Sequence, residues 1–185
     1  MHKRMAEAVA RVARKVNETV ENNEDHLDLA DCMLNAFPIA IYKVMENVTE
    51  AIHSISLANN EIKALTGKFF TTFCQLRELN LAGNCLHQLP EEAGTLQHLK
   101  VINLSRNKFQ DFPQQLAALS TLETIDLEEN QITDVPVEKL TSMKAIRCLN
   151  LKSNPLNSDR LALFKSLINF QLLTSLEEVP AAAQA

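Results

Sequence analysis

Short stretches in which apolar and polar residues alternate recur along most of this chain. In one of them, Leu79 and Leu81 flank Asn80, and Asn84 follows three residues after the second leucine. Because side chains along a strand point alternately to opposite faces, this pattern predicts a short strand with both leucines facing inward and Asn80 facing outward. After the strand, apolar residues return about every third position, as at Leu116, Leu119 and Leu122, which favours a 3₁₀ or irregular helical turn.

The alternating stretch returns at a nearly constant period. Each copy carries asparagine, or cysteine in the first copy, at one fixed point after the strand. These points are residues 32, 60, 84, 107, 130 and 154, so the successive spacings are 28, 24, 23, 23 and 24 residues. A period of this length indicates a solenoid, in which each unit buries its apolar face only by stacking on its neighbours.

The six copies resemble the leucine-rich repeat family over about residues 26–157, because each reads LxxLxLxxN/CxL or a close variant. A Leu-Pro or Phe-Pro pair after several strands makes the array similar to intracellular members, including the Ras-suppressor group. The resemblance implies an α/β solenoid with a curved parallel sheet on its concave side and short 3₁₀ or helical segments on its convex side. It also implies protein binding, and it implies no catalytic residues.

Helical spacing appears in three places outside the strands. Residues 1–25 predict an N-terminal amphipathic capping helix, and residues 158–179 predict a C-terminal capping helix. Residues 39–52 predict a further helix within the long first repeat, and residues 180–185 form a tail that should fray. The apolar stripes assigned to the two caps are Met5, Val9, Val12, Val16 and Val20, and Leu161, Phe164, Ile168 and Leu172. We therefore expect one domain with a helix over each end of the array.

The repeated asparagines are best explained by structure. An inward-facing amide must satisfy its donors and acceptor, so each of these side chains should bond the backbone where a strand turns away. The asparagines of this column are Asn60, Asn84, Asn107, Asn130 and Asn154. Cys32 occupies the same place in the first repeat, where a small buried thiol can substitute. Asn103, by contrast, is expected to face solvent.

No arrangement of nucleophiles or metal ligands stands out. Cys148 should lie beside Thr124 and Val101 in the stack, with no histidine to act as a base. Cys85, His87 and His98 supply three borderline ligands without a fourth, which is weak evidence for a metal site. We expect no enzyme activity, no cofactor and no metal.

Composition and charge narrow the partners and the compartment. Lysine and arginine number 18 against 23 aspartates and glutamates, and the net charge of −5 argues against nucleic acid. The four cysteines form no CxxC pair and no secretory signal precedes them, so free thiols and a cytoplasmic location are expected. No apolar stretch is long enough to cross a membrane. We expect a monomer.

The candidate binding surface is the concave face, which the sequence predicts to be polar and to lack Trp or Tyr anchors. Its candidate residues are Glu78, Asn80, Asn103, Arg106, Asp126, Glu128, Glu129, Asn150 and Lys152. The carboxylates at 126, 128 and 129 predict a protein partner with a basic segment. The expected function is that of a non-catalytic interaction module or adaptor.

A second function stays open because of the N-terminal helix. Residues 1–16 contain five lysines and arginines against the single Glu7. A basic amphipathic helix can locate a protein at a membrane or in an organelle. Glu7 and the obvious use of the apolar stripe as a lid favour capping, so we consider a membrane partner the less favoured alternative.

Overall fold

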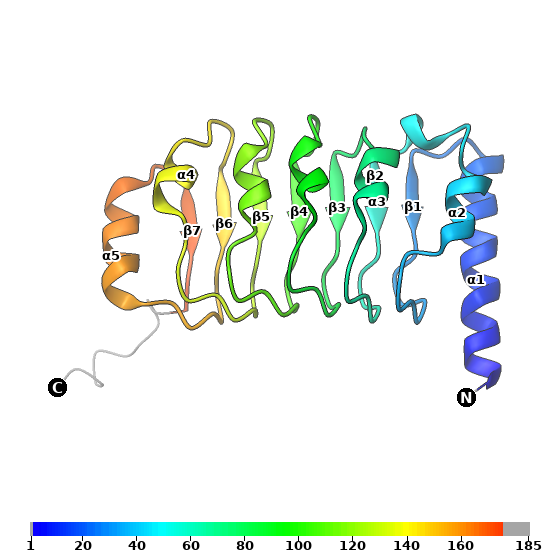
Figure 1. Cartoon of the computed structure of the whole chain (residues 1–185), viewed down its shortest axis with the longest axis horizontal. Helices are drawn as coiled ribbons and strands as arrows, with labels where there is room; N and C mark the ends of the chain where they lie inside the picture. Colours follow the sequence, from blue (N-terminus) through cyan, green and yellow to red (C-terminus); the bar gives the residue numbers. More distant parts are fainter. Residues whose placement is uncertain (1, 176–185) are drawn as a thin grey trace.

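The computed structural model describes residues 2–175 as a single row of parallel strands (Figure 1). The seven strands pair in sequence order and all run parallel. They are β1 (His26–Asp28), β2 (Ser54–Ser56), β3 (Glu78–Asn80), β4 (Val101–Asn103), β5 (Thr124–Asp126), β6 (Cys148–Asn150) and β7 (Gln171–Leu173). The expected leucine-rich-repeat solenoid of α/β class is confirmed.

The strands align without any shift in register, so equivalent residues of successive repeats lie side by side. The central residue of each strand from β1 to β6 is buried, as the alternating pattern predicts. These residues are Leu27, Ile55, Leu79, Ile102, Ile125 and Leu149. Each contributes to one continuous apolar core that runs the length of the array.

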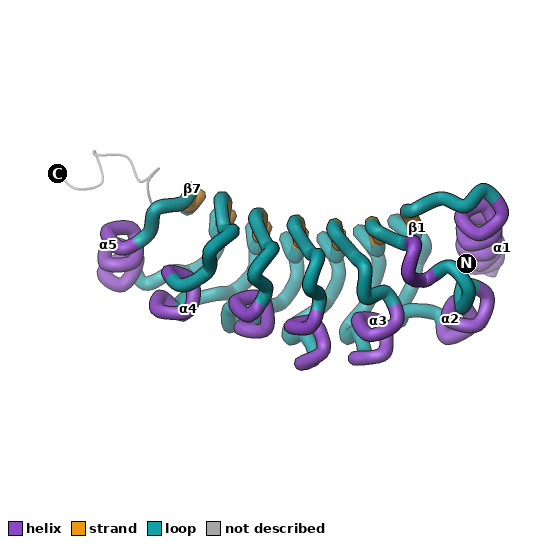
Figure 2. The backbone as a smooth tube through the Cα atoms, turned by 90° about the horizontal axis from the view of Figure 1, so that it is seen from above, coloured by secondary structure: helices purple, strands orange, loops and turns teal. Residues whose placement is uncertain are grey.

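Short helical segments line the side opposite the sheet (Figure 2). They are α2 (Ile39–Val44), η1 (Thr49–Ala51), α3 (Gly67–Thr72), η2 (Glu91–Thr95), η3 (Gln114–Ala118) and α4 (Val137–Thr141). The segments η2 and η3 are the expected 3₁₀ turns. The single helix predicted over 39–52 is wrong, because α2 ends at Val44 and the chain turns before it reaches β2. Met45 is fully buried at this turn, whereas Val44 is half-exposed.

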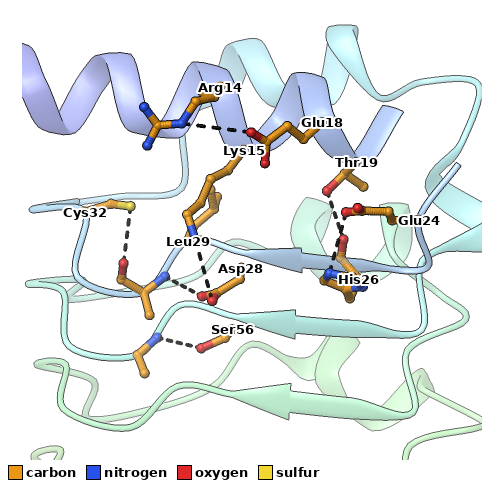
Figure 3. Close-up of polar contacts among 12 residues, drawn as sticks. Arg14, Lys15, Glu18, Thr19, Glu24, His26, Asp28, Leu29, Cys32 and Ser56 are labelled. Atoms are coloured by element: carbon orange, nitrogen blue, oxygen red, sulfur yellow. Dashed lines mark hydrogen bonds and ion pairs between the residues drawn. The ribbon is translucent and has the colours of Figure 1, made fainter. Parts of the chain in front are cut away.

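The N-terminal helix α1 (His2–Glu21) covers the free side of β1, where Val12 and Val16 join the core. Figure 3 shows the polar contacts that hold it. Thr19 Oγ1 donates to the His26 carbonyl at 2.9 Å, and Lys15 Nζ lies 3.7 Å from an Asp28 carboxylate oxygen. These contacts fix one face of α1 against the first repeat.

The apolar stripe predicted for this helix is only partly buried. Met5 and Val9 are 51% and 69% exposed, while Ala8 and Thr19 are buried in their place. Figure 1 shows that the N-terminal end of α1 extends beyond the first repeat. A stripe read from sequence shows which residues share a helix face, but not how far the neighbouring structure reaches along it.

The C-terminal cap is also shorter than the predicted helix over 158–179. The helix α5 (Ser158–Leu167) begins at Asn157, whose side-chain oxygen accepts the N–H groups of Asp159 and Arg160 at 3.1 Å. After Leu167 the chain forms β7, and Leu172 pairs with Leu149 instead of continuing the helical stripe. The open edge of β6 offers backbone hydrogen bonds to any strand that reaches it. Residues 176–179 and the expected frayed tail lie outside the described residues.

The asparagine column forms the expected ladder between repeats. Asn107 Oδ1 accepts the Leu86 N–H at 2.9 Å, and its Nδ2 donates to the carbonyls of Leu81 and Leu104 at 2.9 and 3.1 Å. The same pattern recurs at Asn60, Asn84, Asn130 and Asn154. The ladder ends at Cys32, which is buried and donates its own N–H to Asn60. The structural interpretation of this column is confirmed.

The residue immediately before Cys32, and before each asparagine of the column, has a positive φ angle. These residues are Asp31, Asn59, Gly83, Arg106, Glu129 and Ser153, with φ angles of 54°, 57°, 69°, 53°, 58° and 57°. A left-handed conformation costs most residues with a β-carbon about 1–2 kcal/mol, and less for Asn and Asp, whereas Gly83 avoids this cost. The turn is therefore strained in most repeats.

Glu129→Gly should raise the free energy of unfolding by about 0.5–1 kcal/mol. Relief of the left-handed strain outweighs the extra backbone freedom that glycine brings to the unfolded chain. Glu128→Gly is the matched control. Glu128 lacks the positive φ angle, so glycine at this position should lower the free energy of unfolding. Urea titration of both variants measures the difference, and two equal losses of stability would contradict the strain.

Candidate protein-binding surface

The concave face consists of two solvent-facing columns, one from the first and one from the third residue of each strand. The first column contains His26, Ser54, Glu78, Val101, Thr124 and Cys148. The second contains Asp28, Ser56, Asn80, Asn103, Asp126 and Asn150. Neighbouring strands lie about 4.8 Å apart, so each column is a dense row of small or polar groups.

The second column also supports the backbone. Asn103 Oδ1 accepts the Ser105 N–H at 2.9 Å, and Asp126 Oδ1 accepts the Glu128 N–H at 3.0 Å. The corresponding acceptors in the other repeats are Asp28, Ser56, Asn80 and Asn150. Asn103 lies on the outward side of its strand, as expected, but it is half-buried and also closes an Asx turn. The recurrence of Asn, Asp or Ser two residues before the turn was the signal that could have revealed this.

The charged candidates divide between this face and the turns that follow it. Arg106 and Glu129 occupy equivalent turn positions in successive repeats. Glu128 and Lys152 are also equivalent to each other, and each lies one residue before that turn position in its own repeat. Each acidic residue therefore neighbours a basic one. Within residues 2–175, none of these four side chains makes an ion pair within 4 Å. Arg106, Glu128, Glu129 and Lys152 thus form a patch of alternating charges that remain available to a partner.

Glu78 lies apart from that patch. It is exposed on β3, where its register partner on β4 is Val101. The remaining amide candidates, Asn80 and Asn150, sit in the second column and keep their Nδ2 groups free of the Asx bonds, which use only Oδ1. The structure thus places the nine predicted residues along one side of the array but does not gather them at one point.

The best sequence candidate for a nucleophile is poorly suited to that role. Cys148 lies beside Thr124, as expected from the repeat. Burial raises the pKa of its thiol, and the nearby Asp126 carboxylate raises it further. A raised pKa lowers the fraction of thiolate, which is the reactive form. The local electrostatics therefore oppose nucleophilic chemistry at this position.

Two further findings concern metals and membranes. Over residues 2–175, no group of three or more histidine, cysteine or acidic side chains is arranged to hold a metal ion. His87 and His98 are both exposed, and Cys85 is half-buried on its turn. The helices described for this chain include none that is long and apolar enough to cross a membrane.

An apolar groove at the N-terminal end was not anticipated. It has a volume of about 350 Å³ and is lined by α1, α2 and the turn at residues 32–34. We call it the cap groove. Its lining residues are Met5, Ala8, Val9, Val12, Ala13, Val16, Asn17, Cys32, Met33, Leu34, Pro38, Ala40, Ile41 and Val44. The sequence analysis did not predict this groove, because it assigned the whole apolar stripe of α1 to the core.

The repeat geometry, the asparagine ladder and the polar concave sheet define a leucine-rich-repeat solenoid. The family profile for a leucine-rich repeat region matches residues 52–181, and the chain belongs to this family. It is 65% identical to leucine-rich repeat-containing protein 20 of Mus musculus over 181 residues, which is 98% of either chain. Its identity to the Homo sapiens protein of that name is 64% over 177 residues, or 96% of either chain.

Solved structures show the same fold. A leucine-rich repeat protein of Leptospira interrogans superposes with a TM-score of 0.66 at 27% identity, covering 76% of this chain and 34% of that one. An internalin of Listeria monocytogenes superposes with a TM-score of 0.62 at 17% identity, covering 80% and 40%. The chain thus spans between a third and two fifths of these larger proteins.

Proposed function

We propose that this protein is a non-catalytic protein-binding module, an adaptor of the cytoplasm, that recognises its partner on the concave face. The rigidity of that face supports the proposal most directly. Its strands are in register, the asparagine ladder locks each turn to the next, and the Asx bonds hold the second column in place. A surface ordered before binding loses little conformational entropy when it binds. All four cysteines are free thiols, as a reducing compartment requires.

The chemistry of the partner follows from the unpaired charges. Glu128, Glu129 and the free oxygen of Asp126 would attract lysine or arginine side chains of a partner segment. Arg106 and Lys152 lie next to these carboxylates, so acidic residues spaced between the basic ones would complete the match. Such charge pairs mainly set the association rate and the choice of partner, and salt weakens them. The proposed partner is a protein with a basic segment that also carries acidic residues.

Glu128→Lys with Glu129→Lys should remove partner binding while the fold is retained. Asp126 is left unchanged, because its carboxylate accepts the Glu128 N–H and its loss would perturb the turn. Glu91→Lys with Glu138→Lys is the matched control, since both residues are exposed on the helical side. Pull-downs at low salt, beside circular dichroism melts, compare the two variants. Equal recovery of partners by both variants would place the interface elsewhere.

A further inference from the structure

The last strand, β7, leaves backbone groups unpaired along its outer edge. In each earlier strand, the carbonyl just before the strand accepts an N–H group of the next strand, as the Lys100 carbonyl does from β5 at 3.0 Å. The N–H group just after the strand donates to the next strand, as that of Leu104 does at 2.7 Å. The corresponding groups beside β7 are the Phe170 carbonyl and the Thr174 N–H. Neither has a partner within residues 2–175.

The apolar core also reaches this edge without a further repeat to cover it. The central residues of β1 to β6 are at most 1% exposed, whereas Leu172, the central residue of β7, is only half-buried. Leu173 is half-buried in the second column, where the other six strands carry Asp, Ser or Asn. Thr174 is 3% exposed, and its Oγ1 has no hydrogen-bond partner among the described residues. A buried hydroxyl without a partner marks a place for a further donor or acceptor.

We propose that this edge binds an extended segment of another protein, which adds to the sheet as an eighth strand. Backbone groups of the segment pair with the Phe170 carbonyl and the Thr174 N–H, and its alternate side chains continue the core. The three residues at the edge specify its chemistry. An aliphatic residue lies beside Leu172, an apolar residue beside Leu173, and a serine or threonine within reach of the Thr174 hydroxyl. This site is separate from the charged patch of the concave face and does not depend on it.

A second copy of this chain fits the edge poorly. The strands β1 and β7 are the outer strands of the described sheet, and α1 packs against β1. The helix α5 lies beyond β7 along the long axis and on the helical side of the sheet (Figures 1 and 2). Two copies that approached edge to edge would bring their α5 helices together before the two β7 strands could pair. A single extended segment needs only the layer of the sheet.

The continuation of this chain after β7 is directed away from the edge. Ser175 Oγ accepts the Ser153 N–H at 2.7 Å, so Ser175 follows the path of the earlier turns instead of reversing along β7. In the preceding repeat, the Lys152 carbonyl accepts the Glu129 N–H in the same way at 2.9 Å. The sequence after Ser175 contains Pro180 and several alanines, which are poor strand formers. These features favour a partner segment over the chain's own continuation.

A synthetic peptide with the sequence of residues 121–128 and the change Leu127→Thr provides a model strand. Within the array, this sequence includes β5, which adds to β4 in the parallel direction. The threonine takes the place beside Thr174 if the peptide adds to β7 in the same register. Fluorescence anisotropy of the labelled peptide with the full chain should give a Kd on the order of 100 µM.

Methylation of single peptide nitrogens distinguishes strand addition from adhesion of apolar side chains. The N–H group of Thr124 donates to the Lys100 carbonyl in the array, so its methylation should weaken binding by about tenfold or more. The N–H group at position 127 points to the opposite side and donates to β6 in the array. Its methylation should leave the affinity unchanged. Equal affinities of the two methylated peptides would overturn the added strand.

Amide signals in two-dimensional NMR locate the bound peptide. Signals of residues 170–175 should change, and those of β1 to β3 should not. A peptide with Leu127→Val, which keeps the shape but lacks the hydroxyl, should bind about threefold more weakly. The concave-face variant Glu128→Lys with Glu129→Lys should bind the model peptide with unchanged affinity at physiological ionic strength. The edge and the proposed concave interface can therefore fail independently.

Three other results would overturn the proposal. The first is the absence of any signal change at residues 170–175 with about 1 mM peptide. The second is a set of changes confined to the cap groove or to the concave face. The third is binding by a chain shortened to residue 176 but not by the full chain, which would assign the edge to residues 177–185 instead of a partner.

Discussion

Replacement of Asn107 by alanine should lower the free energy of unfolding by about 2–4 kcal/mol. The amide is only 3% exposed and bonds the backbone of two repeats at once. Its removal leaves the Leu86 N–H and the Leu81 and Leu104 carbonyls in an interior where water cannot replace it. Unpaired buried groups of this kind cost more than the bonds themselves contribute in the native protein.

Urea titration measures this effect, and Asn103 supplies the comparison. Asn103→Ala removes one half-buried acceptor and should cost about 1 kcal/mol, whereas Asn103→Asp keeps an oxygen for the Ser105 N–H and should be nearly silent. The expected order of stability is therefore wild type, then Asn103→Ala, then Asn107→Ala. If the midpoints of the two alanine variants coincided, the buried bonds of Asn107 would contribute no more to stability than the half-buried bond of Asn103.

Deletion of residues 2–21 should destabilise the N-terminal end of the array and cause aggregation. The deletion removes Val12 and Val16 from the core and uncovers Leu27 and Leu29 in the first repeat. Burial of one aliphatic side chain contributes about 1.5–3 kcal/mol, so these two valines alone represent about 3–6 kcal/mol. Stability in a solenoid is mainly a nearest-neighbour property, and a terminal cap keeps the end soluble. The loss should therefore be local.

Amide hydrogen exchange can show whether the loss of stability is confined to the N-terminal repeats. Amides of β1 should lose protection in the truncated chain, while those of β5 and β6 keep it. Val16→Asp offers a milder form of the same test, because Val16 is buried, and Val9→Asp is its control at an exposed position of the same helix. Unchanged exchange in β1 after truncation, with an unchanged melting temperature, would show that α1 is not a structural cap.

The sequence alone determined the repeat, the strand positions and the register. Leu79, Ile102 and Ile125 recur at a fixed spacing, and a period of two leaves only one face that can be buried. The asparagine ladder was predictable for a related reason, since an inward-facing amide such as Asn107 must find backbone partners. These features depend on contacts between adjacent repeats. Because the repeats have similar sequences, the sequence of one repeat predicts which residues of the next one it contacts.

Only the tertiary structure decided the features at the ends and on the surface. Leu172 fits a helical stripe equally well, but the open edge of β6 binds it as a strand. The stripe on α1 contains Met5 and Val12 alike, and the extent of the first repeat determines which one is buried. Asn103 appears outward by alternation, yet the turn that follows brings the Ser105 N–H to its oxygen. In each case periodicity assigns a face to a residue, whereas the neighbouring structure decides what that face meets.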